Sequence, residues 1–153
     1  MEKIYRLNEE QATLLMTYLK NTDTVRAFKK ELVRQFYLIR RELTARAIAR
    51  EARKPTRREM TDSIRDCLPE SPHKAMYYKH YTDLAYKAAL GKTSKELRAE
   101  RNAPAKANIA EYLTAAETGA VKHVEGQIGV LVEMGLDYQQ IKSMLTNKLA
   151  RVS

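Results

Sequence analysis

Residues 24 to 54 have the sequence TVRAFKKELVRQFYLIRRELTARAIAREARK, and this stretch decides the architecture that the chain predicts. Its first half carries six large apolar side chains, three or four residues apart, a spacing that keeps them on one face of an α-helix. These residues are Val25, Phe28, Leu32, Phe36, Ile39 and Leu43. The same face continues in four arginines, which are Arg46, Arg50, Arg53 and Arg57. We therefore expect one long helix over residues 24–54, with its apolar half packed in a domain and its basic half leaving that domain as an exposed arm.

The rest of the chain also favours helices over strands. Of its 153 residues, 44% are hydrophobic, and only five glycines and four prolines are available for the many turns of a sheet. No apolar run approaches the roughly 18 residues that a membrane-spanning helix needs. The sequence thus predicts an all-α protein with no membrane partner. Its single cysteine, Cys67, excludes an internal disulfide and favours a reducing cytoplasm.

Five capping boxes mark expected helix starts, because a small polar side chain and a Glu or Gln three residues later can satisfy each other's free backbone amides. The pairs are Asn8–Gln11, Thr56–Glu59, Thr93–Glu96, Thr114–Glu117 and Asp137–Gln140. The first pair opens a helix over 9–20, which should pack antiparallel to the long helix because the connection is short. Pro55 removes an amide donor and is expected to end or kink the long helix.

These boundaries divide the chain into three segments. Residues 1–54 form a helical hairpin that includes the long helix, residues 55–71 a short helix and linker, and residues 72–153 a C-terminal helical bundle. Within the bundle, Gly126 and Gly129 interrupt one helix, each at a cost of about 1 kcal/mol relative to alanine. We interpret them as the place where another helix, of the same or of another subunit, crosses closely.

Positive charge is concentrated on the long helix. The chain has a formal net charge of +9, and residues 1–60 hold 15 Lys and Arg against 8 Asp and Glu. Lys54 lies beside the row of Arg46, Arg50, Arg53 and Arg57. Such a row can follow the phosphate backbone of a nucleic acid or pair with an acidic protein, and a solvated helix surface is the third interpretation. Because the face lacks Asn and Gln, we do not expect sequence-specific base recognition.

Tyrosines crowd the helix that follows Pro72. Tyr77 and Tyr81 share a face with Leu84 and are expected in the core, whereas Tyr78 lies among lysines and is a candidate contact residue. Aromatic and basic side chains together can stack bases, but they are equally typical of protein interfaces. We favour a protein interface for this helix.

No group of residues indicates an enzyme, a cofactor or a metal site. Gly91-Lys92-Thr93 lacks the earlier glycine and the preceding strand of a phosphate-binding loop, and a helix terminator followed by an N-cap explains it. His73, His80 and Cys67 do not have the spacing of a zinc site. We therefore expect no catalytic, cofactor-binding or metal-binding residues.

LNEEQATLLMTYLKNTDTVRAFKKELVRQFYLIRREL, residues 7–43, resembles the end of the N-terminal domain of Rha-type phage regulatory proteins. The matching positions are Leu7, Glu10, Gln11, Leu14, Leu15, Asn21, Val25, Phe28, Lys29, Leu32, Val33 and Phe36. YTDLAYKAALGKTSKELRAER and EYLTAAE, residues 81–101 and 111–117, are similar to C-terminal regions of prophage antirepressors. In that family more chain precedes this point, whereas here only MEKIYR, residues 1–6, does, so we expect that the DNA-reading half is missing.

The resemblance implies a non-enzymatic role in the lysis–lysogeny decision of a phage within its bacterial host cell. The implied partner is a phage repressor protein, bound by protein–protein contact, and we also expect a homo-oligomer. The alternative is a nucleic-acid-binding module that uses the basic face of the long helix, with DNA as its partner.

Overall fold

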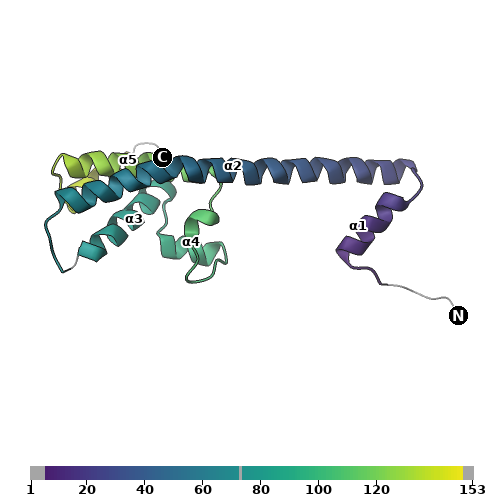
Figure 1. Cartoon of the computed structure of the whole chain (residues 1–153), viewed down its shortest axis with the longest axis horizontal. Helices are drawn as coiled ribbons and strands as arrows, with labels where there is room; N and C mark the ends of the chain where they lie inside the picture. The colour runs from purple at the N-terminus through teal and green to yellow at the C-terminus, as the bar shows by residue number, and fades with distance from the viewer. Residues whose placement is uncertain (1–5, 73, 150–153) are drawn as a thin grey trace. The chain divides into compact units, whose positions relative to one another are not determined.

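The structure, a computed structural model, describes residues 6–72 and 74–149, and every regular element within these ranges is a helix. In chain order the elements are α1 (Glu9–Tyr18), α2 (Asp23–Cys67), α3 (Lys74–Leu90), α4 (Ser94–Glu100), the short 3-10 helix η1 (Ile109–Glu111), α5 (Ala115–Glu133) and α6 (Tyr138–Leu149) (Figure 1). The predicted all-α class is confirmed. The chain divides into an N-terminal unit, residues 1–43, and a C-terminal unit, residues 44–153, and α2 contributes residues to both.

Helix α2 runs for 45 residues with Pro55 inside it, so the predicted end of the helix at this proline is wrong, as is the separate helix within 55–71. Proline removes an amide donor and crowds the preceding turn, at a cost of about 3 kcal/mol in a helix interior. Two side chains beyond the proline are fully buried in the core, Met60 (1% exposed) and Ile64 (0% exposed), and their burial offsets that cost. The division of the chain into two units falls between residues 43 and 44, inside α2.

Four of the five predicted capping boxes are present. In α1 the Gln11 amide donates to Asn8 Oδ1 (2.8 Å) and the Asn8 amide donates to Gln11 Oε1 (3.1 Å). Equivalent reciprocal bonds begin α4, α5 and α6, at Thr93–Glu96, Thr114–Glu117 and Asp137–Gln140. The fifth pair, Thr56–Glu59, lies inside α2 and marks no helix start. A local capping signal therefore predicts a helix start only where the preceding turn is not itself helical.

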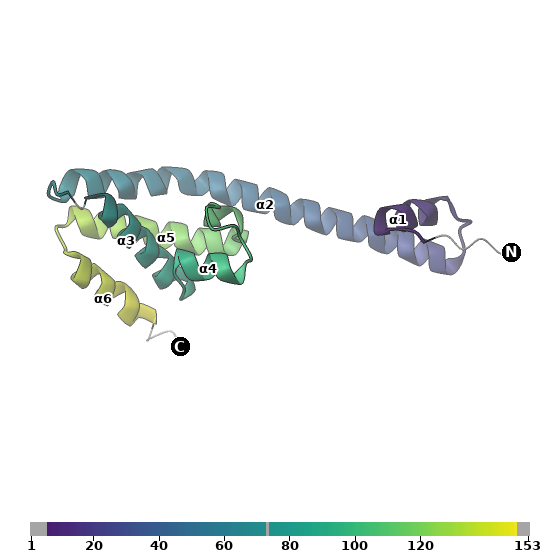
Figure 2. The same ribbon diagram turned by 90° about the horizontal axis from the view of Figure 1, so that it is seen from below.

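A hydrophobic core fills the C-terminal unit. Helices α3 and α5 lie side by side, and α6 contacts both (Figure 2). The buried side chains come from all the helices of this unit, and examples are Ile64 of α2, Tyr81 of α3, Leu97 of α4, Ile128 of α5 and Ile141 of α6. The second half of α2 is thus a structural member of the C-terminal unit rather than an arm that leaves a domain.

Two glycines of α5 face the second half of α2. A Cβ atom added at Gly129 would lie 3.4 Å from the Cα atom of Met60, and one added at Gly126 would lie 3.5 Å from Cγ2 of Thr56. The close approach that we predicted for these glycines is therefore made inside the C-terminal unit, between α5 and α2.

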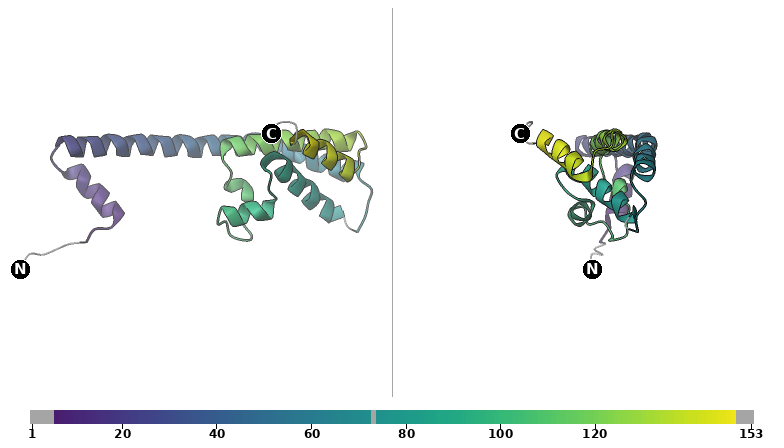
Figure 3. Two further views of the ribbon diagram at one scale, coloured as in Figure 1. Left: turned by 180° about the vertical axis from the view of Figure 1, so that it is seen from behind. Right: turned by 90° about the vertical axis from the view of Figure 1, so that its left-hand side faces the viewer.

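The N-terminal unit has almost no core. Helix α1 buries none of its residues, and Val25 is the only buried side chain among residues 6–43. Figures 1 and 3 show α1 at an angle to the start of α2, and the antiparallel pairing that the short connection predicts is not confirmed. The turn itself is ordered by Lys29, whose Nζ donates to Asn21 Oδ1 over 2.8 Å. A helix of ten residues, such as α1, buries little surface against a single neighbour, so its pairing with α2 lacks a strong driving force.

Candidate functional site

The apolar face of α2 in the N-terminal unit is exposed, contrary to the prediction that it packs in a domain. Val25 is 7% exposed, and Phe28 and Leu32 are half-buried. Further along, Phe36 and Ile39 are each 59% exposed and Leu43 is 60% exposed. The periodicity located the face correctly, but no other part of the described residues covers its second half.

Apolar side chains also surround this part of α2. Val33 and Tyr37 are each 55% exposed and Leu38 is 46% exposed, on sides of the helix that the predicted stripe does not include. The rings of Phe36 and Tyr37 meet edge to face, with centroids 5.6 Å apart. We call this set, with the exposed leucines of α1, the apolar surface. It comprises Leu14, Leu15, Val33, Phe36, Tyr37, Leu38, Ile39 and Leu43.

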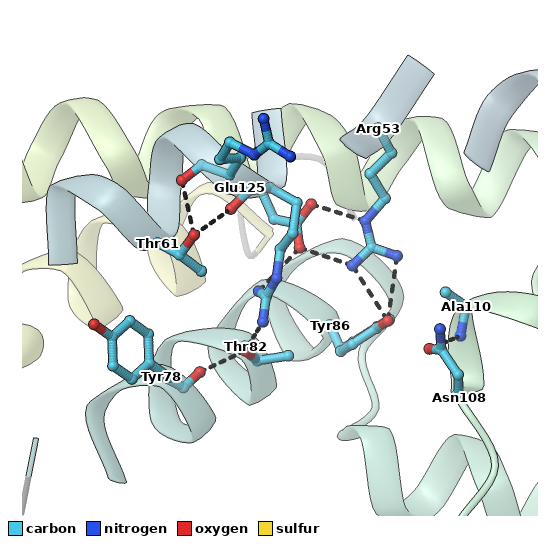
Figure 4. Close-up of polar contacts among 10 residues, drawn as sticks. Arg53, Thr61, Tyr78, Thr82, Tyr86, Asn108, Ala110 and Glu125 are labelled. Atoms are coloured by element: carbon cyan, nitrogen blue, oxygen red, sulfur yellow. Dashed lines mark hydrogen bonds and ion pairs between the residues drawn. The ribbon is translucent and has the colours of Figure 1, made fainter. Parts of the chain in front are cut away.

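The basic half of α2 leads to a buried charge cluster in the C-terminal unit (Figure 4). Glu125 of α5 is fully buried, and its carboxylate accepts two hydrogen bonds from Arg53, from Nε (2.8 Å) and Nη2 (2.7 Å). Both terminal nitrogens of Arg53 also donate to the hydroxyl of Tyr86 at 3.2 Å. Paired donors and acceptors of this kind give a bidentate ion pair of fixed geometry.

A second arginine completes the cluster. Arg57 Nη1 lies 3.2 Å from Glu125 Oε1, and Arg57 Nη2 donates to Thr82 Oγ1 over 2.6 Å. Burial alone would lower the pKa of Arg53, but the hydrogen bonds and charge of Glu125, with Tyr86, outweigh that effect and raise it. Arg53 is therefore a permanent cation whose carboxylate partner lies inside the protein.

These contacts correct the prediction of a continuous exposed basic row. Arg53 is only 7% exposed and is held by Glu125, so it is not available to a partner. Arg57 is partly buried in the same cluster and Arg46 is half-buried. Of the four arginines in the row, only Arg50 is exposed, as is Lys54 beside it. Sequence reasoning missed Glu125, although its position was informative.

The apolar residues on either side of Glu125 in the sequence indicate that its carboxylate is buried. Val121, Val124 and Ile128 lie on the same face of α5 and are buried. A carboxylate on an apolar helix face needs a buried cation, and the arginines of α2 were the obvious source.

The other positions singled out in the sequence, among them Tyr78 and Gly91 to Thr93, make contacts that support the fold. Tyr78 is half-buried against the core, and its backbone carbonyl accepts a hydrogen bond from the hydroxyl of Thr82. Gly91, with φ of 74°, ends α3, and Thr93 caps α4, which confirms the interpretation of that tripeptide. His73 lies outside the described residues. Among the residues that are described, no three His, Cys, Asp or Glu side chains are grouped as metal ligands would be.

A basic pocket lies next to the buried charge cluster. Its volume is about 300 Å³, and its lining comes from α2, α3, α4 and the segment around η1. The lining residues are Arg50, Arg53, Lys54, Arg57, Thr82, Tyr86, Ser94, Arg98, Asn108, Ile109 and Ala110. Five of these side chains are cationic, and no carboxylate is among them.

A larger, mainly apolar groove of about 720 Å³ lies between α5 and α6. Gly126, His123, Val130 and Met144 are among the residues that line it. Val130 is 57% exposed and Met144 53% exposed. Gly126 thus borders two features, since one side of the helix meets α2 and the other opens into this groove.

The described helices include none that is both long and apolar enough to cross a membrane. Comparisons of the chain with protein-family models, with curated proteins and with solved structures gave no match.

Proposed function

We propose that the protein is a non-enzymatic phage regulatory protein of antirepressor type, which binds a repressor protein through the apolar surface of its N-terminal unit. One observation carries the proposal: Phe36, Ile39 and Leu43, which share one helix face, are each 59–60% exposed. The choice of a repressor as the partner rests on the resemblance of residues 7–43 and 81–101 to prophage regulators.

The energetic argument concerns the cost of leaving this surface in water. Burying a large apolar side chain contributes about 1.5–3 kcal/mol relative to leaving it exposed. Contiguous exposed apolar patches larger than a few hundred Å² are typical of protein interaction sites. Because the described part of the N-terminal unit buries only Val25, a partner is the main source of apolar burial for it.

The distribution of the apolar side chains favours a helical partner with more than one helix. The four consecutive residues Phe36, Tyr37, Leu38 and Ile39 point to different sides of α2 and are all exposed. A single partner helix covers only one face of α2, so covering all four side chains takes more than one helix. In this proposal, copies of the chain cover the surface in a homo-oligomer when no repressor is present. The antiparallel hairpin of α1 and α2 that the sequence predicts then belongs to the bound form, followed in the chain by the C-terminal helical bundle.

The test is to compare two variants with equal chemical change. In Phe36→Glu a charge replaces an apolar side chain in the apolar surface, and in Met76→Glu the same is done at a 49% exposed position in the first turn of α3. We expect light scattering to show an oligomer for the wild type and for Met76→Glu, and a smaller species for Phe36→Glu. Co-elution with a cognate prophage repressor, together with release of its operator DNA, should be lost only in Phe36→Glu. A monomeric wild type that also fails to bind the repressor would refute the proposal.

Nucleic-acid binding is the second candidate function, and the exposed cations Arg50 and Lys54 favour it. It is weakened because Arg53 and Arg57 are held by Glu125, which interrupts the row that would follow a phosphate backbone. If duplex DNA migrates more slowly with the wild type and normally with an Arg50→Glu, Lys54→Glu variant, this candidate gains over the first.

A further inference from the structure

We propose that the basic pocket beside Arg53 binds a small anion that carries phosphate groups. The pocket is separate from the apolar surface, and it belongs wholly to the C-terminal unit. Its charge is the first argument. Arg50, Arg53, Lys54, Arg57 and Arg98 line a space of about 300 Å³, and Glu125 is the one carboxylate that pairs with the cations at its base.

Like charges gathered around a concave space repel one another, and an anion in that space removes the repulsion. The carboxylate of Glu125 is fully buried and contacts only Arg53 and Arg57 among these cations, so it neutralises only part of the positive charge. The other cations of the lining, Arg50, Lys54 and Arg98, make no contact with Glu125. Lys54 pairs with Glu51, but both partners are about two-thirds exposed, so water and salt weaken this pair.

The second argument is that the base of the pocket is rigid. Arg53 is fixed by two hydrogen bonds to Glu125 and two to the hydroxyl of Tyr86 (Figure 4). Arg57 is fixed by Glu125 on one side and by Thr82 on the other. Arg53 and Arg57 thus contribute fixed positive charge to the pocket, while direct contacts to an anion are left to the other cations that line it.

The third argument concerns donors that are still unused. Arg50 is exposed, and in the part of the chain that the structure describes it makes no hydrogen bond or ion pair. The Nε atom of Arg98 donates to the carbonyl of Ala107 over 3.0 Å, and this bond does not use the two terminal nitrogens of the guanidinium. A planar guanidinium matches two oxygens of a phosphate at once. The size of the pocket suits one or two phosphate groups, and a phosphodiester of a nucleic acid is the other source of the same chemistry.

The experiment is calorimetric titration of the full chain with pyrophosphate, in buffers of low and of physiological ionic strength. Arg50→Gln removes one unused guanidinium, and Arg58→Gln is its matched control, because Arg58 is exposed on the same helix and does not line the pocket. We expect Arg50→Gln to weaken binding about tenfold, as loss of a charge-assisted contact does. Arg58→Gln should bind as the wild type does, and Arg50→Lys should recover part of the affinity. Unchanged circular dichroism would show that each variant is folded.

A labelled DNA duplex distinguishes the two sources of phosphate. Duplex binding that pyrophosphate displaces, and that Arg50→Gln weakens, would assign the phosphate to a nucleic acid in this same pocket. Pyrophosphate binding without duplex binding would assign it to a small molecule. The proposal is overturned if pyrophosphate does not bind at millimolar concentration, or if Arg58→Gln loses as much affinity as Arg50→Gln.

Discussion

Glu125 is the residue around which the charges of the C-terminal unit are arranged. Its carboxylate is fully buried and contacts both Arg53 and Arg57. A buried ion pair adds little net stability against a well-packed apolar pair, because both ions lose their hydration. Removing one partner is different, since the other charge then stays buried without compensation.

We therefore expect Glu125→Ala to destabilise the protein by about 3–5 kcal/mol. The matched control is Glu51→Ala, which removes a carboxylate from an exposed pair with Lys54 (2.7 Å) and should cost at most about 1 kcal/mol. Urea unfolding followed by circular dichroism, at one fixed protein concentration, measures both. Equal effects of the two substitutions would show that the buried cluster is not formed.

At the scale of the residue, then, sequence reasoning identified the arginines but not their environment. A row of four arginines on one helix face has the same pattern whether water or a carboxylate lies opposite. The partner of Arg53 is 72 positions away in the sequence, and no local spacing relates the two. The contrary case is Thr114–Glu117, where donor and acceptor are three residues apart and the predicted bonds are present.

Helix α2 is the element whose length was underestimated, because proline is a strong local signal against a helix and tertiary burial is not visible locally. Met60 and Ile64 follow Pro55 on the core-facing side of the helix. Their apolar spacing predicts a helix, but the spacing does not show whether that helix is separate from the one before the proline. These two side chains reach the core only if the helix continues past Pro55, and their burial therefore favours one continuous helix.

The proline should still carry its local cost. We expect Pro55→Ala to stabilise the protein by about 1–3 kcal/mol, because alanine restores an amide donor for the carbonyl of Glu51 and relieves the crowded turn. The measurement is the shift of the urea midpoint. Glu59→Ala, a change at an exposed position of the same helix, should shift it far less. Destabilisation by Pro55→Ala would contradict this expectation and show that the proline itself is needed at this position.

At the scale of the whole molecule, the two units differ in what holds them together. The C-terminal unit has a core with side chains from six elements, whereas the described residues of the N-terminal unit bury only Val25. The helical periodicity of the sequence locates an apolar helix face in each unit. It could not show whether that surface is covered within one chain or between chains, because both arrangements need the same periodicity.

Hydrogen exchange should separate the two units. We expect the amides of α1 and of residues 23–43 to exchange rapidly in dilute solution and more slowly as the protein concentration rises, because association covers the apolar surface. The amides of α3 and α5 should be protected equally at all concentrations. Phe36→Glu should abolish the concentration dependence without changing the protection of α5. Full protection of α1 in dilute monomer would contradict this account.

The seclusion of Arg53 and Arg57 has a practical consequence for handling the protein. Arg53 is buried, and Arg57 partly buried, only while α5 stays docked on α2. Loss of that docking would expose two of the cations that the net charge of +9 already counts. Partly unfolded protein should then bind polyanions, such as heparin resin or contaminating RNA, more tightly than the folded protein does. Late elution from a heparin column would therefore indicate that a preparation contains partly unfolded protein.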